Sequence, residues 1–94
     1  MTKLATSIDE NSAEAKANHA ALLQQIEALS LTANDIMKGG SKQTRKRHTD
    51  RGKLLPRDRI TALLDPGTPF LEIGLFAAYN VYDEDIPSAG IIAG

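Results

Sequence analysis

The sequence predicts a mostly α-helical chain, in which one long helix is followed by short basic helices and then by short β-strands. Apolar residues at helical spacing run through residues 12–38, whereas alternating stretches bounded by Gly and Pro appear only after residue 66. Aromatic residues are scarce, with two Phe, two Tyr and no Trp, all from residue 70 onward. Ninety-four residues therefore suffice for one small domain with a modest core.

The composition excludes several kinds of function. The chain has no Cys, which rules out disulfides, thiolate metal sites and a thiol nucleophile, and which fits a reducing compartment. No apolar run approaches the length of a membrane span. The N-terminal residues include Asp9, Glu10 and Glu14 and contain no apolar signal core, so we expect neither a secretory signal nor a mitochondrial transit peptide.

The net charge of −1 hides a strong asymmetry along the chain. Residues 1–37 hold two Lys against five acidic residues, a balance of −3. Residues 38–59 hold nine Lys or Arg against two acidic residues, a balance of +7, and residues 60–94 hold five acidic residues and no Lys or Arg, a balance of −5. The sequence thus has a basic centre between two acidic arms.

The first predicted element is an amphipathic helix over residues 12–38, after a loose lead-in at residues 1–11. Ser7 and Glu10 have the spacing of a capping box, Ser12 is a second possible N-cap, and Gly39-Gly40 stops the helix. Apolar or neutral residues follow alternating steps of four and three, as in a coiled coil, at Ala15, His19, Leu22, Ile26, Leu29, Ala33 and Ile36. A helix of roughly 40 Å cannot bury this face against so short a remainder, so we expect a seam of Leu22, Ile26, Leu29 and Ile36 to pack on a partner.

Two shorter helices are expected in the basic centre. Ser41 can cap a polar helix that runs through His48 and has almost no apolar face. Gly52 allows a tight turn, and Pro56 suits the first turn of the next helix, which residues 65–67 (Asp-Pro-Gly) terminate.

The remaining residues predict short strands. Residues 70–73 alternate in polarity, residues 83–85 form an exposed acidic loop, and residues 90–94 read as a strand that is just beginning. Because the sequence ends within that expected strand, we expect residues 39–94 to be the start of a larger, truncated domain.

The basic centre is the strongest chemical signal. Its candidate contact residues, which we call the basic surface, are Arg45, Arg47, Arg51 and Lys53. They could bind the phosphates of a nucleotide-bearing ligand such as CoA, contact a neighbouring acidic surface, or bind nucleic acid. We favour structural pairing over a phosphate ligand, and a phosphate ligand over nucleic acid, because no aromatic residue is interleaved with these charges for base stacking. The acidic residues 83–85 offer one possible pairing partner.

No catalytic or metal-binding constellation is apparent. His48 and Asp50 lie in a charged corner without a nucleophile pattern, and His19 lies in the apolar seam, where a packed side chain is expected. The acidic residues 83–85 lack the spacing and the glycine of a calcium loop. From the residues alone we predict no catalytic residue and no metal site.

Three stretches resemble a known family. These are residues 47–60 (RHTDRGKLLPRDRI), residues 64–73 (LDPGTPFLEI) and residues 83–94 (DEDIPSAGIIAG). They are similar to the leading segment of the β subunits of biotin-dependent acyl-CoA carboxylases, and the LLPR, PFLE and IPSAGII runs look most like the methylcrotonoyl-CoA branch. Geranyl-CoA and propionyl-CoA carboxylase β subunits are the alternatives within the family.

The resemblance implies a function that the residues alone do not show. The β subunit of this family is a carboxyltransferase, classed as a ligase, with two α/β domains of the ClpP/crotonase type. It moves a carboxyl group from carboxybiotin, carried on a partner α subunit, to an acyl-CoA. The implied substrate is 3-methylcrotonoyl-CoA, from leucine degradation, and the implied partners are further β subunits in an oligomer and the α subunit.

The same resemblance limits what this segment does by itself. The glycine-rich oxyanion segments of the family lie further downstream, so we expect the 94-residue chain alone to be inactive and to bind no cofactor. The implied location is the cytoplasm for a bacterial protein and the mitochondrial matrix for a eukaryotic one. The rival interpretation, of another class, is a small basic nucleic-acid-binding module or a helical interaction module.

Overall fold

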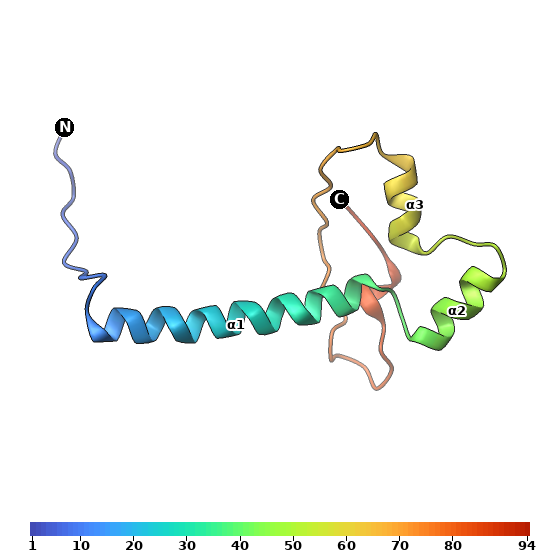
Figure 1. Ribbon diagram of the computed structural model, residues 1–94, viewed down its shortest axis with the longest axis horizontal. Coiled ribbons are helices and arrows are strands. Elements are labelled where there is room, and N and C mark those ends of the chain that lie inside the picture. Colours follow the sequence, from blue (N-terminus) through green and yellow to red (C-terminus); the bar gives the residue numbers. More distant parts are fainter. The chain divides into compact units, whose positions relative to one another are not determined.

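The computed structural model describes residues 1–94, and all of its regular secondary structure is helical (Figure 1). It has three α-helices, α1 (Ala13–Met37), α2 (Lys42–Asp50) and α3 (Pro56–Leu63), and a short 3-10 turn, η1 (Pro87–Gly90). The helical part of the predicted fold class is confirmed.

Helix α1 is one uninterrupted helix of 25 residues (Figure 1). The Ser12 hydroxyl accepts a hydrogen bond from the Ala15 N–H at 3.1 Å and donates one to the Asp9 carbonyl at 2.8 Å, which satisfies a free amide of the first turn. Gly39 ends the helix in a left-handed conformation (φ 76°), and its N–H donates to the Ile36 carbonyl at 3.0 Å.

Helix α2 and the corner after it are set by local hydrogen bonds. The Ser41 hydroxyl accepts from the Thr44 N–H at 3.1 Å and caps the helix. Gly52 follows with φ 77°, a conformation that glycine adopts without strain, and its N–H donates to the Thr49 carbonyl at 2.9 Å. The His48 ring nitrogen Nε2 then donates to the Leu54 carbonyl at 2.7 Å, which closes the corner before α3.

Helix α3 begins at Pro56, whose missing N–H costs nothing in the first turn. Asp58 lies in that first turn, where its carboxylate meets the positive end of the helix. The helix ends at Leu63, and Gly67 in the turn that follows has φ 77°.

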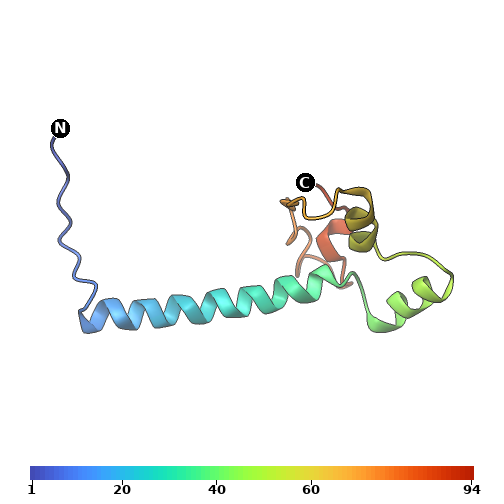
Figure 2. The ribbon, with the colours of Figure 1, turned by 45° about the horizontal axis from the view of Figure 1, so that its top comes forward.

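The predicted β-strands at residues 70–73 and 90–94 are wrong, because the structure contains no strand. The two segments meet at a single antiparallel bridge between Ile73 and Ala93, where the Ile73 N–H donates to the Ala93 carbonyl at 2.7 Å. Neither Figure 1 nor the turned view in Figure 2 contains a strand arrow. Two short segments that pair without a third strand or a covering helix do not form a stable β-ladder. In addition, Gly74 (φ 78°) interrupts the extended backbone directly after Ile73.

Residues 74–86 form a succession of turns. Three consecutive bonds span three residues each, from the N–H groups of Ala77, Tyr79 and Val81 to the carbonyls of residues 74, 76 and 78. Ala78 and Asn80 have positive φ values of 64° and 53°, which a regular helix does not allow. This stretch is therefore irregular and not helical.

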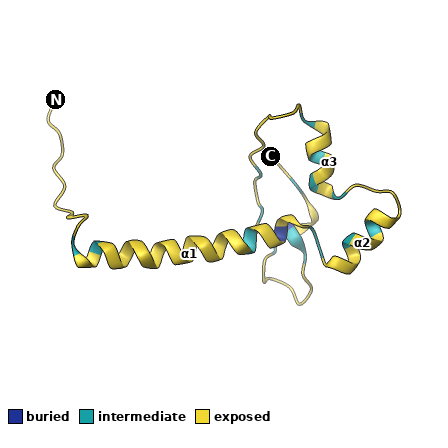
Figure 3. Ribbon diagram, viewed as in Figure 1, coloured by how far each residue is buried: buried dark blue, intermediate teal, exposed yellow.

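The chain divides into two compact units, residues 1–30 and residues 31–94. Only Ile36 and Ser88 are buried, with 8% and 5% of their surface exposed, and both belong to the second unit (Figure 3). The seam residues Leu22, Ile26 and Leu29 of the first unit are about half exposed, at 57%, 50% and 55%. The core of the molecule is therefore confined to the second unit, around the end of α1.

Candidate functional site

Arg57, in the first turn of α3, holds together three other segments of the second unit. Its Nε donates to Glu72 Oε2 at 3.0 Å, and its Nη2 donates to Glu72 Oε1, so the two side chains form a two-pronged ion pair. Its Nη1 donates to the Met37 carbonyl at 3.1 Å, at the C-terminal end of α1. A guanidinium group suits this role because its donors lie in one rigid plane.

Ser88 completes this cluster, which we call the Arg57 node. Arg57 Nη2 also donates to Ser88 Oγ at 3.2 Å, and that hydroxyl donates to the Leu75 carbonyl at 3.0 Å. The side chains of Arg57 and Glu72 are only 19% and 13% exposed, so water screens this ion pair far less than a surface pair. Ser88 has a left-handed backbone (φ 52°), and its buried hydroxyl has partners on both sides.

The sequence analysis did not single out Arg57, although a signal for it was present. Arg57, Glu72 and Ser88 lie in the LLPR, PFLE and IPS runs respectively, three separate stretches on which the family resemblance rests. The structure brings these three stretches together at one point. The opposite charges of Arg57 and Glu72 in two of the recognised stretches were the available clue that these stretches meet.

The four residues of the basic surface lie in α2 and the corner after it. Arg47, Arg51 and Lys53 are exposed and Arg45 is half-buried. Three ion pairs form within the chain, Asp35 with Lys38, Lys46 with Asp50 and Arg57 with Glu72, and none of them uses the basic surface. Its residues also make no side-chain hydrogen bond, so their charges have no partner within the chain.

A shallow hollow of about 390 Å³ lies on α2 beside this surface, lined by Gln43, Lys46, Arg47, Asp50 and Arg51. Lys46 and Asp50 pair across one helical turn at 2.6 Å and neutralise each other in part. Arg47 and Arg51, also one turn apart, leave a net positive charge at the hollow. Two guanidinium groups at this hollow suit an anionic group, either a phosphate or a carboxylate.

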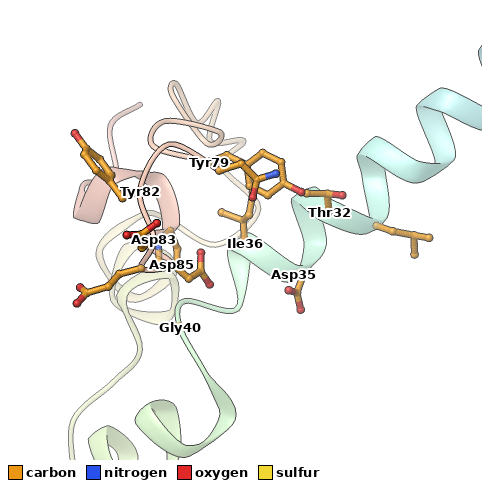
Figure 4. A pocket seen from close by; sticks show the side chains of 12 residues that line it. Thr32, Asp35, Ile36, Gly40, Tyr79, Tyr82, Asp83 and Asp85 are labelled. Atoms are coloured by element: carbon orange, nitrogen blue, oxygen red, sulfur yellow. The ribbon is translucent and has the colours of Figure 1, made fainter.

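The second unit also contains an acidic groove of about 520 Å³ (Figure 4). Its charged lining consists of Asp35 from α1 and Asp83, Glu84 and Asp85 from the loop before η1. Figure 4 shows Tyr79 beside Thr32 and Ile36 of α1, while Tyr82 lies with the acidic loop. The acidic loop forms no ion pair with the basic surface of the same chain, which was one of the pairings considered from the sequence.

A third hollow, of about 360 Å³, is mainly apolar and lies next to the Arg57 node. Apolar side chains from α1, α3 and the segment after it line the hollow: Met37, Ile60, Leu64, Phe70 and Leu75. Arg57 and Glu72 also line it, but they are already paired with each other. Asp65 lines the hollow as well and forms no ion pair. The hollow can therefore receive an apolar group, with one carboxylate in its lining.

No group of three or more His, Cys, Asp or Glu side chains is placed to hold a metal ion. No helix is both long enough and apolar enough to span a membrane.

Comparison with known proteins shows one consistent set of relatives. The chain is 57% identical over 56 residues, 60% of its length, to the biotin-dependent 3-methylcrotonyl-coenzyme A carboxylase beta1 subunit of Mycobacterium tuberculosis. It is 40% identical over 92 residues, 97% of its length, to a probable mitochondrial methylcrotonoyl-CoA carboxylase beta chain of Drosophila melanogaster. It is also 40% identical over 87 residues to the mitochondrial methylcrotonoyl-CoA carboxylase beta chain of Arabidopsis thaliana, 93% of this chain.

The matches cover 60% to 97% of this chain and a small part of each relative. The chain spans 11% of the Mycobacterium subunit, 16% of the Drosophila chain and 15% of the Arabidopsis chain. No family model matches the chain. The pairwise similarity alone therefore shows that the chain is homologous to the N-terminal region of methylcrotonoyl-CoA carboxylase beta subunits.

Proposed function

We propose that this chain, which is homologous to the N-terminal region of methylcrotonoyl-CoA carboxylase beta subunits, forms the leading segment of a carboxyltransferase subunit. The complete subunit moves a carboxyl group from carboxybiotin, held on a partner α subunit, to an acyl-CoA. The substrate that the relatives' names support best is 3-methylcrotonoyl-CoA. Geranyl-CoA and propionyl-CoA remain the alternative substrates within the family.

One observation carries this proposal: the three stretches that resemble the family form one structural cluster. Residues 47–60 supply Arg57, residues 64–73 supply Glu72, and residues 83–94 supply Ser88 to the Arg57 node. A chance likeness of short runs would not be expected to place one polar residue from each run in a single hydrogen-bonded group. The segment therefore acts as a folded unit of the subunit, not as a loose leader.

The role of this segment is structural, and the chemistry lies elsewhere in the subunit. Arg57 and Glu72 form an ion pair with each other, and the His48 ring donates a hydrogen bond to the Leu54 carbonyl. Neither group is poised to give or take a proton during carboxyl transfer. We therefore propose that the free chain has no carboxylase activity. We also propose that it docks on the remainder of the subunit through the exposed seam residues Leu22, Ile26 and Leu29 and through the apolar hollow beside the Arg57 node, whereas the fourth seam residue, Ile36, is already buried within the chain.

Assembly of a chimeric subunit tests this proposal. The corresponding N-terminal residues of the Mycobacterium beta1 subunit would be replaced by this chain, and the chimera would be produced together with its biotin-carrying partner. The expected result is a complex of the same mass as that formed by the unaltered subunit, measured by light scattering. A chimera that is soluble but does not assemble, while the unaltered subunit does, would overturn the proposal.

The basic surface has two proposed roles in the complete subunit, contact with acyl-CoA phosphates or with a neighbouring acidic surface. Replacing Arg51 with Ala in the chimera separates them. A rise of about tenfold in the KM for acyl-CoA with unchanged thermal stability would favour the phosphate role, since a charge-assisted hydrogen bond contributes roughly that much. Loss of stability or of the oligomer at an unchanged KM would favour the contact role. If neither the KM nor the stability changes, the basic surface has neither of the two proposed roles.

A further inference from the structure

Helix α3 borders two hollows that share one of its residues. The first hollow is the apolar hollow beside the Arg57 node. The second hollow, of about 380 Å³, is lined by α3, by the end of η1 and by the residues that follow: Pro56, Arg59, Ile60, Leu63, Gly90 and Ile92. Ile60 lines both hollows, and residues three or four apart lie on the same side of a helix. The two hollows therefore adjoin each other along one face of α3.

Each hollow has one charged side chain that is not paired within the chain. Asp65 lines the first hollow and Arg59 lines the second, and both residues are exposed. The three ion pairs of the chain use neither of them. The face of α3 thus presents one free carboxylate and one free guanidinium group, with the Ile60 side chain shared between the two hollows.

The apolar lining of both hollows is open to solvent. Leu63 in the second hollow is 81% exposed, and Phe70 in the first hollow is 38% exposed. Figure 3 shows that most of α3 is exposed as well. Large apolar side chains that remain exposed side by side with unpaired charges are typical of a surface that another polypeptide covers.

We propose that the two hollows of α3 receive one segment of the remainder of the subunit. This segment carries apolar side chains in its middle, a basic residue that pairs with Asp65 and an acidic residue that pairs with Arg59. The inference rests on the proposed function, since it names the chemistry of a segment on which the chain docks. The chain spans 11% to 16% of its relatives, so a subunit of their length supplies ample further polypeptide for this contact.

The geometry favours a polypeptide segment over a compact ligand. An occupant of both hollows has to cross Ile60, and a helix or an extended peptide does so with successive side chains. A compact ligand would fill one hollow and leave the other charge unpaired. The opposite charges also fix the direction of the segment, because a reversed segment would bring like charges together.

Alkylation of a single introduced thiol tests the proposal. The chain contains no Cys, so Leu63→Cys gives it one thiol beside the second hollow, and Thr68→Cys gives it one beside the first. Both positions are exposed, and circular dichroism of the free chain would verify that the helices are kept. The rate is measured in the free chain and in the chimeric subunit without its biotin-carrying partner, and mass spectrometry identifies the alkylated peptide.

We expect each thiol to react at least about tenfold more slowly in the chimeric subunit than in the free chain, because a covered thiol reacts only when the contact opens. Adding Arg59→Glu or Asp65→Lys should restore most of the rate, since each reversal places like charges against each other. Lys42→Glu and Glu84→Lys are the matched controls. Both residues are exposed and lie outside the two hollows, so their reversal should leave the slow rate unchanged.

Three outcomes would overturn the proposal. These are equal alkylation rates in the free chain and the chimeric subunit, charge reversals that act no more than their controls, or protection that appears only when the biotin-carrying partner is added. The last result would assign the surface to that partner. Because the thiols are measured in the subunit alone, a chimera that does not assemble contradicts the proposed function and leaves this contact standing.

Discussion

Arg57 carries more of the tertiary structure than any other side chain, because its five donors reach three separate segments. It connects the end of α1, the segment around Glu72 and the 3-10 turn η1 to helix α3. Two of its four partner atoms belong to a carboxylate, so removing the guanidinium would leave a half-buried charge without its counter-ion. A broken pair of this kind costs far more than a surface ion pair.

The Arg57 node leads to a stability prediction. We expect Arg57→Ala to lower the free energy of unfolding by about 2 kcal/mol, because Glu72, Ser88 and the Met37 carbonyl all lose a donor and the pair keeps some access to water. Urea denaturation of the full chain, followed by circular dichroism, measures this change. Arg59→Ala is the matched control, since Arg59 is exposed in the same helix and its side chain makes no ion pair.

Two further comparisons test whether the Arg57 node stabilises the second unit. Arg57→Lys keeps the charge and loses the planar fork, so its stability should fall between those of the unaltered chain and Arg57→Ala. If Arg57→Ala costs no more than Arg59→Ala, the node does not hold the second unit together.

At the scale of single elements, the helices could be predicted because their signals are local. Ser12, Ser41 and Pro56 mark three helix starts within one turn of the residues they affect, and each start is found in the structure. The Arg57 node could not be predicted in this way, since its partners Glu72, Met37 and Ser88 are 15, 20 and 31 residues away. Contacts between residues so far apart in the sequence depend on tertiary packing, and the local sequence pattern does not predict them.

The prediction of two strands was wrong for a related reason. The alternation in residues 70–73 is a local signal, but a strand exists only through the strands beside it. In this chain one bridge, between Ile73 and Ala93, is all that the two segments form. The turns of residues 74–86 depend on positive φ values at Ala78 and Asn80. Residues other than glycine seldom adopt positive φ, so the residue types at these positions did not predict the turns.

The seam of α1 gives a prediction at this scale. In the free chain, Ile26→Asp should change helicity by only a few per cent, because the Ile26 side chain is half exposed and the helix loses little more than intrinsic propensity. In the assembled chimera, the same change should weaken the complex at least tenfold, because a carboxylate would be buried without a partner. Gln24→Asp, at a nearby exposed position of the same helix, is the matched control.

Circular dichroism and the mass of the chimera at decreasing concentration check both statements. Equal assembly of the Ile26→Asp and Gln24→Asp chimeras would show that the seam faces solvent in the complete subunit as well. A large loss of helicity in the free chain would show instead that Ile26 already has a partner there.

At the scale of the whole molecule, neither of the two units has a dense core. Only two residues are buried, and large apolar side chains are exposed in both units. Such a chain does not bury enough apolar surface for a dense core, which agrees with a segment that completes its packing on the rest of a larger subunit.

The central claim, that this chain is the leading segment of a methylcrotonoyl-CoA carboxyltransferase subunit, is tested most directly by turnover. The chimera described above would be combined with its biotin-carrying partner, ATP, bicarbonate and 3-methylcrotonoyl-CoA, and carboxylated product would be measured with the free chain as the blank. The account predicts a kcat within about tenfold of the unaltered subunit, since the catalytic residues are retained and only their scaffold is exchanged. An assembled chimera without turnover, or turnover by the free chain alone, would contradict it.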